Sequence, residues 1–490
     1  MNADRNPRAS AAGPDPQPSP PFHQPPAASP LTPQQVQNGL RISIFEGTFA
    51  TIHASLIGGV FMTGLALRWG ATTFQFGLLS AIAALFTAAS IVGALLVSRL
   101  GERKPLTVIT SVVGRSIFLV YLPFLLTHHR LSIWLFLLVV AVFNLLLVIA
   151  GNAWTSWMGD LVPEASRGRY FGIRNTLMSL TTMVFAFLAG RYLEANKTDQ
   201  GFAWVCVLGV LAGVVAMILL RLQPEPRTLK PVAPRPVMPA LRAVISEPWS
   251  DLKFRKFIRF MAVWSLIAPL ASGFYSVHLL KNLSHDSYSL LGIYIAVSAA
   301  CGIAFQWLWG RGIDRFGAKP VMFLNLLCTG MLPLFWVFAT PRFLLPIWLD
   351  AVGNGLFWSG ATLAWFNLLL SFASGRENRD AYFALFTAVT GIAGFLSSLL
   401  GGTIAQLLNS FTWQVGPFRF TNFQVLFALA GIGRFASLGL LRSVPDERAA
   451  PVSEVLAGIG EYTVRRLSSG KDLVLESFNL ITRRIFPPPG

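Results

Sequence analysis

The chain has 490 residues, of which 53% belong to the hydrophobic set and only 12% are charged, and its formal net charge is +17. Soluble domains carry about a quarter charged residues, so this composition excludes an ordinary soluble globular protein. The basic residues stand in short clusters between apolar runs, which favours a membrane protein over one that binds nucleic acid. The three cysteines lie inside apolar stretches, so we expect no disulfide framework.

The chain begins with residues 1–40, which are rich in proline, alanine and glutamine and have no apolar segment typical of a signal peptide. We interpret them as a disordered cytoplasmic tail. Twelve apolar stretches follow, each close to the roughly 20 residues that a membrane-spanning helix needs. They are residues 42–67, 74–98, 105–127, 131–157, 170–193, 201–221, 257–280, 287–310, 320–340, 343–371, 380–408 and 421–442. The predicted fold is an all-α integral membrane protein with twelve transmembrane helices.

Residues 222–256 separate the first six spans from the last six and are rich in proline, arginine and lysine. They predict a cytoplasmic linker between two six-helix halves, residues 41–221 and 257–443, which we expect to be related by pseudo-symmetry. Residues 444–490 include an amphipathic stretch, 452–467, and are predicted to form a cytoplasmic tail. This tail either lies on the inner leaflet as an amphipathic helix or is a frayed helical end.

The distribution of basic residues supports this topology. With the N-terminus in the cytoplasm, the inner loops and their flanks hold twenty lysine and arginine residues, whereas the outer loops hold seven. This excess obeys the positive-inside rule, and an even number of spans places both termini on the same side. Arg174, near the start of the fifth span, is counted with the inner residues. We therefore expect a multi-pass protein of the cytoplasmic (inner) membrane with both termini in the cytoplasm.

Three pairs of short motifs recur in the same order in the two halves. The pairs are residues 99–105 with 311–320, Asn144 with Asn354, and residues 170–171 with 382–383. Each pair is weak evidence alone. Together they indicate an internal duplication, which is common in secondary transporters.

In these loops, and in the order of its elements over residues 42–442, the chain resembles the major facilitator superfamily. The family signature after helices 2 and 8 reads Gly-x-x-x-Asp-Arg-x-Gly-x-Lys/Arg. The second copy matches it at Gly310, Asp314, Arg315, Gly317 and Lys319. The first copy is degenerate because a serine replaces the aspartate, and it keeps Arg99, Gly101 and Arg103. Two further bases resemble the family's inner loop between helices 4 and 5, namely Arg167 and Arg169.

The resemblance implies that these loops act as a latch, in which the aspartate and arginine bind neighbouring helix ends and hold the inward gate closed. Asp314 and Arg315 are expected to do so here, whereas the first copy equally fits a basic turn that only sets topology. Gly317 can take a positive φ and turn the chain tightly between two helices. The resemblance also implies that helices 1 and 7 close the outer gate, where Pro269 and Gly273 can bend helix 7.

Ionisable groups within the spans are candidate functional residues, because a charge at the centre of a bilayer costs ~2.5–3.5 kcal/mol on insertion scales. Asp350 in the tenth span is the first choice for a substrate-binding or coupling carboxylate. An ion pair with Arg115 or Arg434 that only holds helices together is the alternative. Glu46 and His53 lie seven residues apart on one face of the first span. The alternatives for these two are a gate-pairing acid and a packed histidine.

Uncharged polar and aromatic residues mark the central helices 4, 8 and 10. An amide in the membrane needs a partner on another helix or in a cavity. Aromatic walls with a few polar groups are typical of a solute pocket. We therefore add five candidates, one of which is the arginine of helix 3: Arg115, Asn144, Gln306, Asn354 and Trp358.

The leading hypothesis is a secondary active transporter that moves a small solute across the cytoplasmic membrane by alternating access, coupled to an ion or a proton. A drug or metabolite efflux antiporter is an alternative, although the helix 5 glycine-proline signature and the helix 4 arginine of such exporters are absent. An integral-membrane lipid-modifying enzyme and a non-transporting sensor are further alternatives. The sequence has no P-loop, zinc motif or paired carboxylates. We expect a monomer in the lipid bilayer, with no enzymatic activity, cofactor, metal or nucleic-acid partner.

Overall fold

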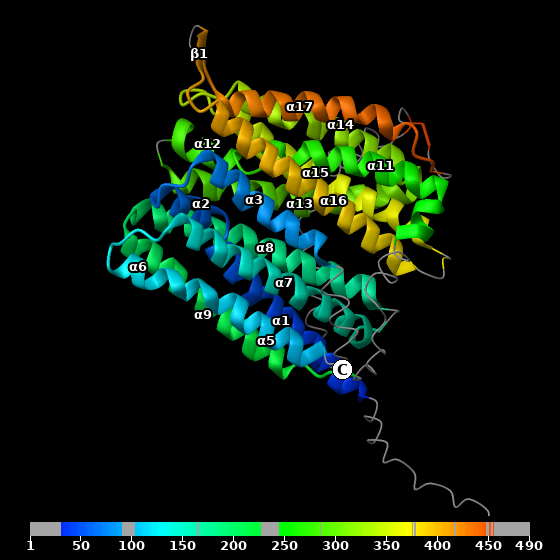
Figure 1. Ribbon diagram of the computed structural model, residues 1–490. Coiled ribbons are helices and arrows are strands. Elements are labelled where there is room, and N and C mark those ends of the chain that lie inside the picture. Colours follow the sequence, from blue (N-terminus) through cyan, green and yellow to red (C-terminus); the bar gives the residue numbers. More distant parts are fainter. Residues whose placement is uncertain are drawn as a thin grey trace, which may run out of the picture.

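The structure, a computed structural model, describes residues 31–90, 103–163, 166–226, 245–284, 286–374, 376, 379–415, 418–446, 450–451 and 454. Most of them lie in long helices that run side by side along one axis (Figure 1). The helices are α1 (Pro33–Ile57), α2 (Gly59–Arg68), α3 (Thr73–Ala88), α5 (Arg103–Ser116), η1 (Ile117–Tyr121), α6 (Leu122–Leu126), α7 (Ile133–Leu161), α8 (Arg167–Ala195), α9 (Asp199–Leu222), α11 (Leu252–Ile267), η3 (Ala268–Ala271), α12 (Tyr275–His278), η4 (Leu279–Leu283), α13 (Tyr288–Phe316), α14 (Ala318–Val337), α15 (Leu345–Ala373), α16 (Arg379–Leu407) and α17 (Asn422–Leu441).

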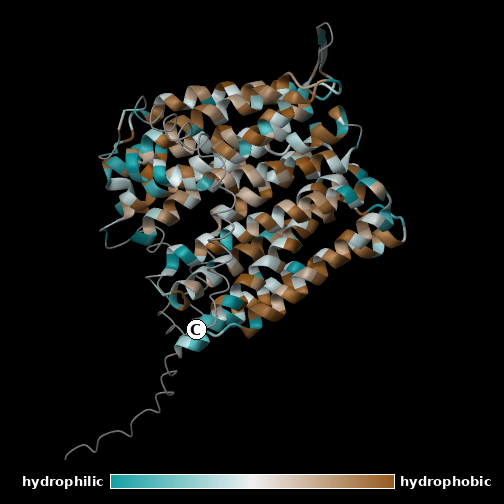
Figure 2. Ribbon diagram, turned by 180° about the vertical axis from the view of Figure 1, so that it is seen from behind, coloured by the Kyte–Doolittle hydropathy of each residue, from teal (hydrophilic) through white to brown (hydrophobic). Residues whose placement is uncertain are grey.

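The helices have the length and composition of membrane spans. Eleven helical stretches among the described residues are long and apolar enough to cross a bilayer, and α3 is a shorter apolar helix. Figure 2 shows hydrophobic residues along the middle of the bundle and hydrophilic residues concentrated towards its ends. The predicted all-α membrane fold is confirmed, and the twelve predicted spans in two halves fit this arrangement.

Two predicted boundaries differ from the structure because capping residues extend the helices. Thr32 caps α1 in a capping box, so α1 starts at Pro33 and the predicted tail residues 33–40 are helical. Asp251 caps α11, so residues 252–256 belong to this helix rather than to the linker. Outside the described residues lie 1–30, 227–244 and 455–490, as well as Arg99 and Gly101.

A two-stranded hairpin projects from one end of the bundle (Figure 1). The sequence had not led us to predict it. Its strands β1 (Thr412–Val415) and β2 (Phe418–Thr421) pair in antiparallel register. Alternating aromatic and β-branched residues on both sides of a Gly-Pro dipeptide are a hairpin signal. We name this end of the bundle the hairpin end. The opposite end, where α1 and α11 begin and α9 and α17 end, is the linker end.

Side-chain packing differs between the two ends. The largest cluster of buried apolar side chains joins both halves near the hairpin end, where Phe61 and Phe202 of the N-terminal half pack beside Tyr288 of the C-terminal half. Towards the linker end each half keeps a cluster of its own, around Trp157 in the N-terminal half and around Phe254 in the C-terminal half. Among the described residues, the halves therefore pack together at the hairpin end and separately at the linker end.

Among the described residues, the most extensive contacts between the halves are those of α3 with α16 and of α8 with α13, and both depend on glycine. A Cβ added to Gly402 would lie 3.0 Å from the Cα of Gly77. One added to Gly190 would lie 2.9 Å from the Cα of Gly292. Side-chain carbons do not tolerate such short contacts with a backbone, so only glycine lets these helices meet.

The helices that begin the two halves are both broken towards the hairpin end. α1 ends at Ile57, and Gly59, the first residue of α2, has φ +39. α11 ends at Ile267, and the short 3-10 turn η3, which contains Pro269, leads towards α12. Glycine adopts positive φ freely and proline lacks the amide hydrogen that continues a helix, so both breaks follow from the sequence. The predicted bend at Pro269 is confirmed.

Replacing Gly77 by leucine is expected to lower the thermal stability of the purified protein, because the side chain would force α3 and α16 apart. Overpacking of this kind costs about 1–3 kcal/mol. Gly439 on α17 is the matched control, since a Cβ added there meets no described atom within 4 Å. Differential scanning fluorimetry in detergent should give a lower melting temperature for Gly77→Leu and an unchanged one for Gly439→Leu. Equal melting temperatures would contradict the close packing.

Candidate functional site

Asp350 on α15 lies at the centre of a polar group in the C-terminal half. The residue is 3% exposed, and its carboxylate accepts a 2.6 Å hydrogen bond from the hydroxyl of Tyr294 on α13. Asn354, one turn further along α15, donates to the same hydroxyl oxygen at 3.4 Å. The ring of Trp336 on α14 stands edge-on to that of Tyr294, with centroids 5.8 Å apart. The candidates Asp350 and Asn354 therefore meet, and Tyr294, which sequence reasoning missed, links them.

Arg434 on α17 does not form the ion pair with Asp350 that the sequence allowed. Its guanidinium donates to the backbone carbonyls of Thr329 and Ala268 at 2.9 and 2.8 Å. These bonds tie α14 and η3 to α17, and the guanidinium lies 5.6 Å from the ring centroid of Trp358. Among the residues that the structure describes, no cation lies within ion-pair distance of the Asp350 carboxylate. The carboxylate is stabilised instead by the hydrogen bond from Tyr294.

Glu46 on α1 holds two arginines together in the N-terminal half. Its carboxylate lies 3.2 Å from Nη2 of Arg115 on α5 and 3.6 Å from Nη2 of Arg174 on α8. The guanidinium of Arg174 also lies 4.4 Å from the ring centroid of Trp154 on α7. Arg174, which is counted with the basic residues of the inner loops and their flanks, lies within a helix, as the predicted fifth span over residues 170–193 already implies. Because α8 already begins at Arg167, Arg174 lies about two turns inside the bundle.

His53 and Asn144 make packing contacts in this structure. The ring Nδ1 of His53 donates to the carbonyl oxygen of Gly209 on α9 at 2.9 Å, and the residue is 2% exposed. The amide of Asn144 donates to the carbonyl oxygen of Val140, one turn earlier on the same helix, at 2.8 Å. These contacts favour the packed histidine over a proton relay, and they leave Asn144 bonded within its own helix.

The face of α8 that meets the C-terminal half at the hairpin end continues as a polar stripe towards the linker end. Ala186 and Gly190 on this face contact α13. At the same helical spacing towards the linker end stand Gly172, Asn175 and Ser179, of which the first two are exposed. Since one face is buried against the other half at one end and exposed at the other, the space between the halves widens towards the linker end.

Gln306 lies on the corresponding face of α13. This face carries Gly292 and Ile295, which contact the N-terminal half at Gly190 and Gly59. Gln306 follows them at helical spacing towards the linker end and is exposed. The candidate Gln306 therefore borders the same space as the polar stripe of α8.

Arg103, from the first copy of the loop signature, braces the linker end of the N-terminal half. Its side chain is 1% exposed and lies 2.8 Å from the carboxylate of Asp160 and 3.3 Å from that of Glu225. Arg167 donates to a backbone carbonyl near the end of α7 at 2.9 Å, and Arg169 is exposed. These contacts of Arg103 and Arg167 lie within one half, which fits a structural turn.

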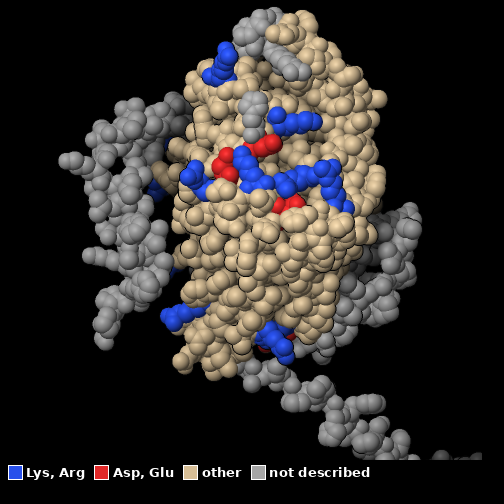
Figure 3. Space-filling model, turned by 90° about the vertical axis from the view of Figure 1, so that its left-hand side faces the viewer, with Lys and Arg blue, Asp and Glu red and all other residues tan. Residues whose placement is uncertain are grey.

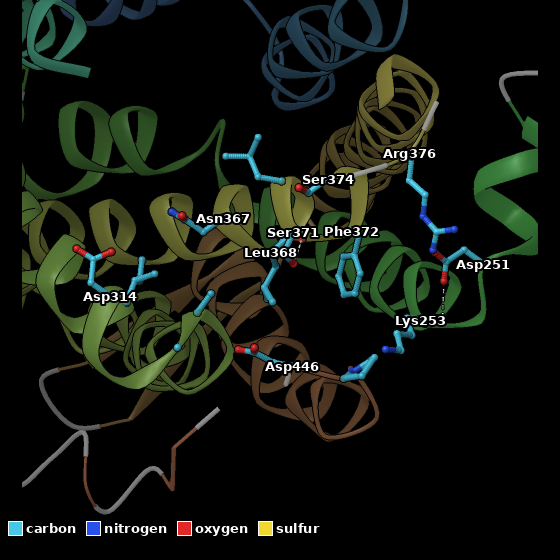
Figure 4. A pocket seen from close by; sticks show the side chains of 15 residues that line it. Asp251, Lys253, Asp314, Asn367, Leu368, Ser371, Phe372, Ser374, Arg376 and Asp446 are labelled. Carbon is cyan, nitrogen blue, oxygen red and sulfur yellow. Dashed lines mark hydrogen bonds and ion pairs between the residues drawn. The ribbon is translucent and has the colours of Figure 1, made fainter. Parts of the chain in front are cut away.

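The second copy of the signature lines a pocket of about 670 Å³ at the linker end of the C-terminal half (Figure 4). Asp314 from α13 stands on the opposite side of this pocket from Arg376, which pairs with Asp251 at 2.6 Å. Among the described residues, the carboxylate of Asp314 has no ion-pair partner. The latch that the resemblance implies for Asp314 is therefore not engaged here and stays a prediction.

The turn of this second copy has the expected backbone geometry. Gly317 has φ +89, in the region that favours glycine. Lys319 bonds to the segment after α17 through both its backbone N–H and its ammonium group. The guanidinium of Arg315 lies over the ring of Phe316, and Gly310 faces α15. The tight turn therefore fixes α13 against the end of α17.

Hydrogen bonds add to the glycine contacts at the hairpin end. The backbone N–H of Ser289 donates to the carboxylate of Glu194 at 3.2 Å, and the hydroxyl of Thr73 donates to the side-chain oxygen of Gln406 at 2.7 Å. Figure 3 shows this face of the molecule, where acidic and basic side chains gather in a band across it. Sequence reasoning missed these contacts because it counted only the charge of the outer loops.

Comparisons with known proteins agree with this architecture. The family model described as Major Facilitator Superfamily matches residues 45–398. The Tetracycline resistance protein, class H, of Pasteurella multocida is 27% identical over 116 residues, which are 24% of this chain and only 28% of that protein. A mutant form of the nucleoside transporter NupG superposes with a TM-score of 0.66 at 10% identity, covering 84% of this chain and 100% of that one. A D-xylose-proton symporter gives 0.60 at 17% identity, covering 83% and 97%.

Replacing Tyr294 by phenylalanine is expected to lower the free energy of unfolding by about 1.5–3 kcal/mol, because the buried carboxylate of Asp350 loses its shortest hydrogen bond. In an Asp350→Asn background the same change should cost less, since the charged acceptor is gone. Denaturation curves in detergent, combined in a double-mutant cycle, measure this coupling. Tyr192→Phe, at a partly exposed position of α8, is the control. Equal costs of Tyr294→Phe in both backgrounds would show that the two groups are not coupled.

Proposed function

We propose that this chain, which belongs to the Major Facilitator Superfamily, is a secondary active transporter that moves a small solute between its two halves by alternating access. The family and the similar solved structures are transporters, so the chain is a membrane transporter and not an enzyme. The observation that supports alternating access most strongly is the uneven contact between the halves. They pack together at the hairpin end and separately at the linker end.

In this conformation the solute enters from the linker end. Its path runs between the polar stripe of α8, with Asn175 and Ser179, and the face of α13 that carries Gln306. Completing the cycle requires the hairpin end to open and the linker end to close. The breaks near Gly59 and Pro269 allow the outer parts of the first and seventh spans to move separately from their inner parts.

We assign the linker end to the cytoplasm and the protein to the cytoplasmic membrane. The loops of this end carry most of the basic residues, as the positive-inside rule requires of cytoplasmic loops. On this assignment the space between the halves faces the cytoplasm, and both termini lie on the same side as the linker.

Asp350 is the group that we assign to energy coupling. Its carboxylate lies within a span, is almost fully buried, and is bonded to a neutral donor on the neighbouring helix rather than to a cation. A carboxylate in that environment is costly while charged, so it is suited to carry one proton through the cycle. Tyr294 and Asn354 join α13 to α15, so a change of charge at Asp350 alters how these two helices are held.

An efflux antiporter for drugs or metabolites is the second candidate function. The local similarity to a tetracycline resistance protein favours it. The same geometry would serve export if the solute binds from the linker end and a proton returns in exchange. The direction of gradient-driven transport separates the two candidates.

Transport assays in proteoliposomes test the proposal. Solutes that raise the melting temperature are first selected from sugars, nucleosides, peptides, organic acids and drugs. The wild type should exchange a selected solute across the membrane and accumulate it against its gradient when a proton gradient is imposed. Asp350→Asn is expected to keep exchange and to lose accumulation, because a neutral amide cannot release a proton.

Asp286→Asn is the matched control, since Asp286 is exposed at the hairpin end. It should exchange and accumulate the solute as the wild type does. Absence of exchange by the wild type would contradict transport itself. Undiminished accumulation by Asp350→Asn would contradict only the coupling role of Asp350.

A further inference from the structure

The ion-paired group around Glu46 in the N-terminal half has one more positive than negative charge. One carboxylate, that of Glu46, is shared by the guanidinium groups of Arg115 and Arg174. All three side chains belong to membrane-spanning helices and are at most 15% exposed. An unbalanced charge in such a place is costly, so the group has the electrostatics of a site for an anion.

Three nitrogen atoms of this group have no hydrogen-bond partner among the described residues. They are Nη1 of Arg115, Nε of Arg174 and Nε1 of Trp154, and all three are buried. A buried donor without an acceptor costs about 1–3 kcal/mol. Guanidinium and indole N–H groups donate and never accept, so the partner that is missing must be an acceptor. The left-over charge and the unpaired donors therefore call for the same ligand, an anion with acceptor oxygens.

The group is not completely shielded from its surroundings. Gly151 lies one turn before Trp154 on the same face of α7, and a Cβ added to this glycine would meet no described atom within 4 Å. The side chains of Arg115 and Arg174 keep 11% and 15% exposure. The two guanidinium groups are therefore not fully enclosed by protein, and the backbone near Trp154 is open at Gly151.

We propose that the solute of this transporter carries an oxyanion, a carboxylate or a phosphate, which binds Arg174 and Arg115 with the indole of Trp154 beside it. The inference rests on the proposed transport function and adds the chemical class of the solute. Guanidinium groups offer paired donors that match both oxyanions, and stacking on an indole holds Arg174 ready for them. The bound oxyanion competes with Glu46 for the two arginines.

This competition connects binding to the gate. Arg174 belongs to α8, and its pair with Glu46 ties α8 to α1. α8 also helps to close the hairpin end, through Gly190. An oxyanion that draws Arg174 away from Glu46 loosens α8 from α1 on the side where the solute binds.

Thermal-shift titrations of the full-length protein at constant ionic strength test this inference, with inorganic phosphate, succinate, mannitol and choline as probes. Phosphate or succinate should raise the melting temperature saturably, and whichever of them acts identifies the oxyanion. Arg174→Gln and Arg115→Gln should each weaken the apparent affinity for it at least about tenfold, since each removes hydrogen bonds to a charged group. Arg221→Gln, exposed at the end of α9, is the matched control and should bind as the wild type does.

Glu46→Gln distinguishes an anion site from ion pairs that only hold helices together. Removing the competing carboxylate should tighten oxyanion binding, whereas loss of binding together with stability would overturn the inference. Saturable binding and exchange of mannitol or choline alone, unaffected by Arg174→Gln, would also overturn it while leaving transport intact. Oxyanion binding that Arg174→Gln abolishes, without any exchange of that oxyanion in proteoliposomes, would support the site and contradict transport instead.

Discussion

Close backbone contact between the two halves at the hairpin end is the constraint on which the rest of the structure depends. α3 meets α16 at Gly77 and Gly402, and α8 meets α13 at Gly190 and Gly292. Lipid tails are as apolar as helix surfaces, so the hydrophobic effect does not drive helices together within a membrane. The contact therefore relies on van der Waals packing and a few hydrogen bonds. Packing of this kind is strong only at close approach and is lost once the surfaces part. A surface with two such states, closed and open, suits a gate.

Each half of the protein buries ionisable side chains within its membrane-spanning helices. In the N-terminal half, Arg115 and Arg174 share the single carboxylate of Glu46 and leave a positive charge over. In the C-terminal half, the carboxylate of Asp350 accepts a hydrogen bond from Tyr294 and has no ion-pair partner among the described residues, while the buried Arg434 donates to backbone carbonyls. An oxyanion brings the charge of the Glu46 group closer to zero, and a proton on Asp350 removes the charge of that carboxyl group. A cavity neutralised in this way is less costly to enclose between apolar surfaces when the halves change position.

Local sequence patterns predict much of this fold but less of the candidate site. Apolar run length sets the spans, and Pro269 and Gly317 impose their backbone geometry wherever they stand. Arg174 lies at the basic inner flank of the predicted fifth span, and only the packing of α8 against α1 shows that it pairs with Glu46. Tyr294 looks like an ordinary span residue until α13 packs against α15. Which cation a buried carboxylate meets depends on contacts between distant helices, and no local periodicity encodes them.

Distances between spin labels, measured by pulsed electron resonance in lipid nanodiscs, test most directly whether the halves exchange which end is closed. One pair of labels at Arg169 and Ser374 spans the linker end, and another at Arg130 and Asn409 spans the hairpin end; all four positions are exposed. Addition of a transported solute should shorten the linker-end distance in the same fraction of molecules in which the hairpin-end distance lengthens. Distances that stay fixed, or that change in the same direction at both ends, would contradict alternating access by this structure.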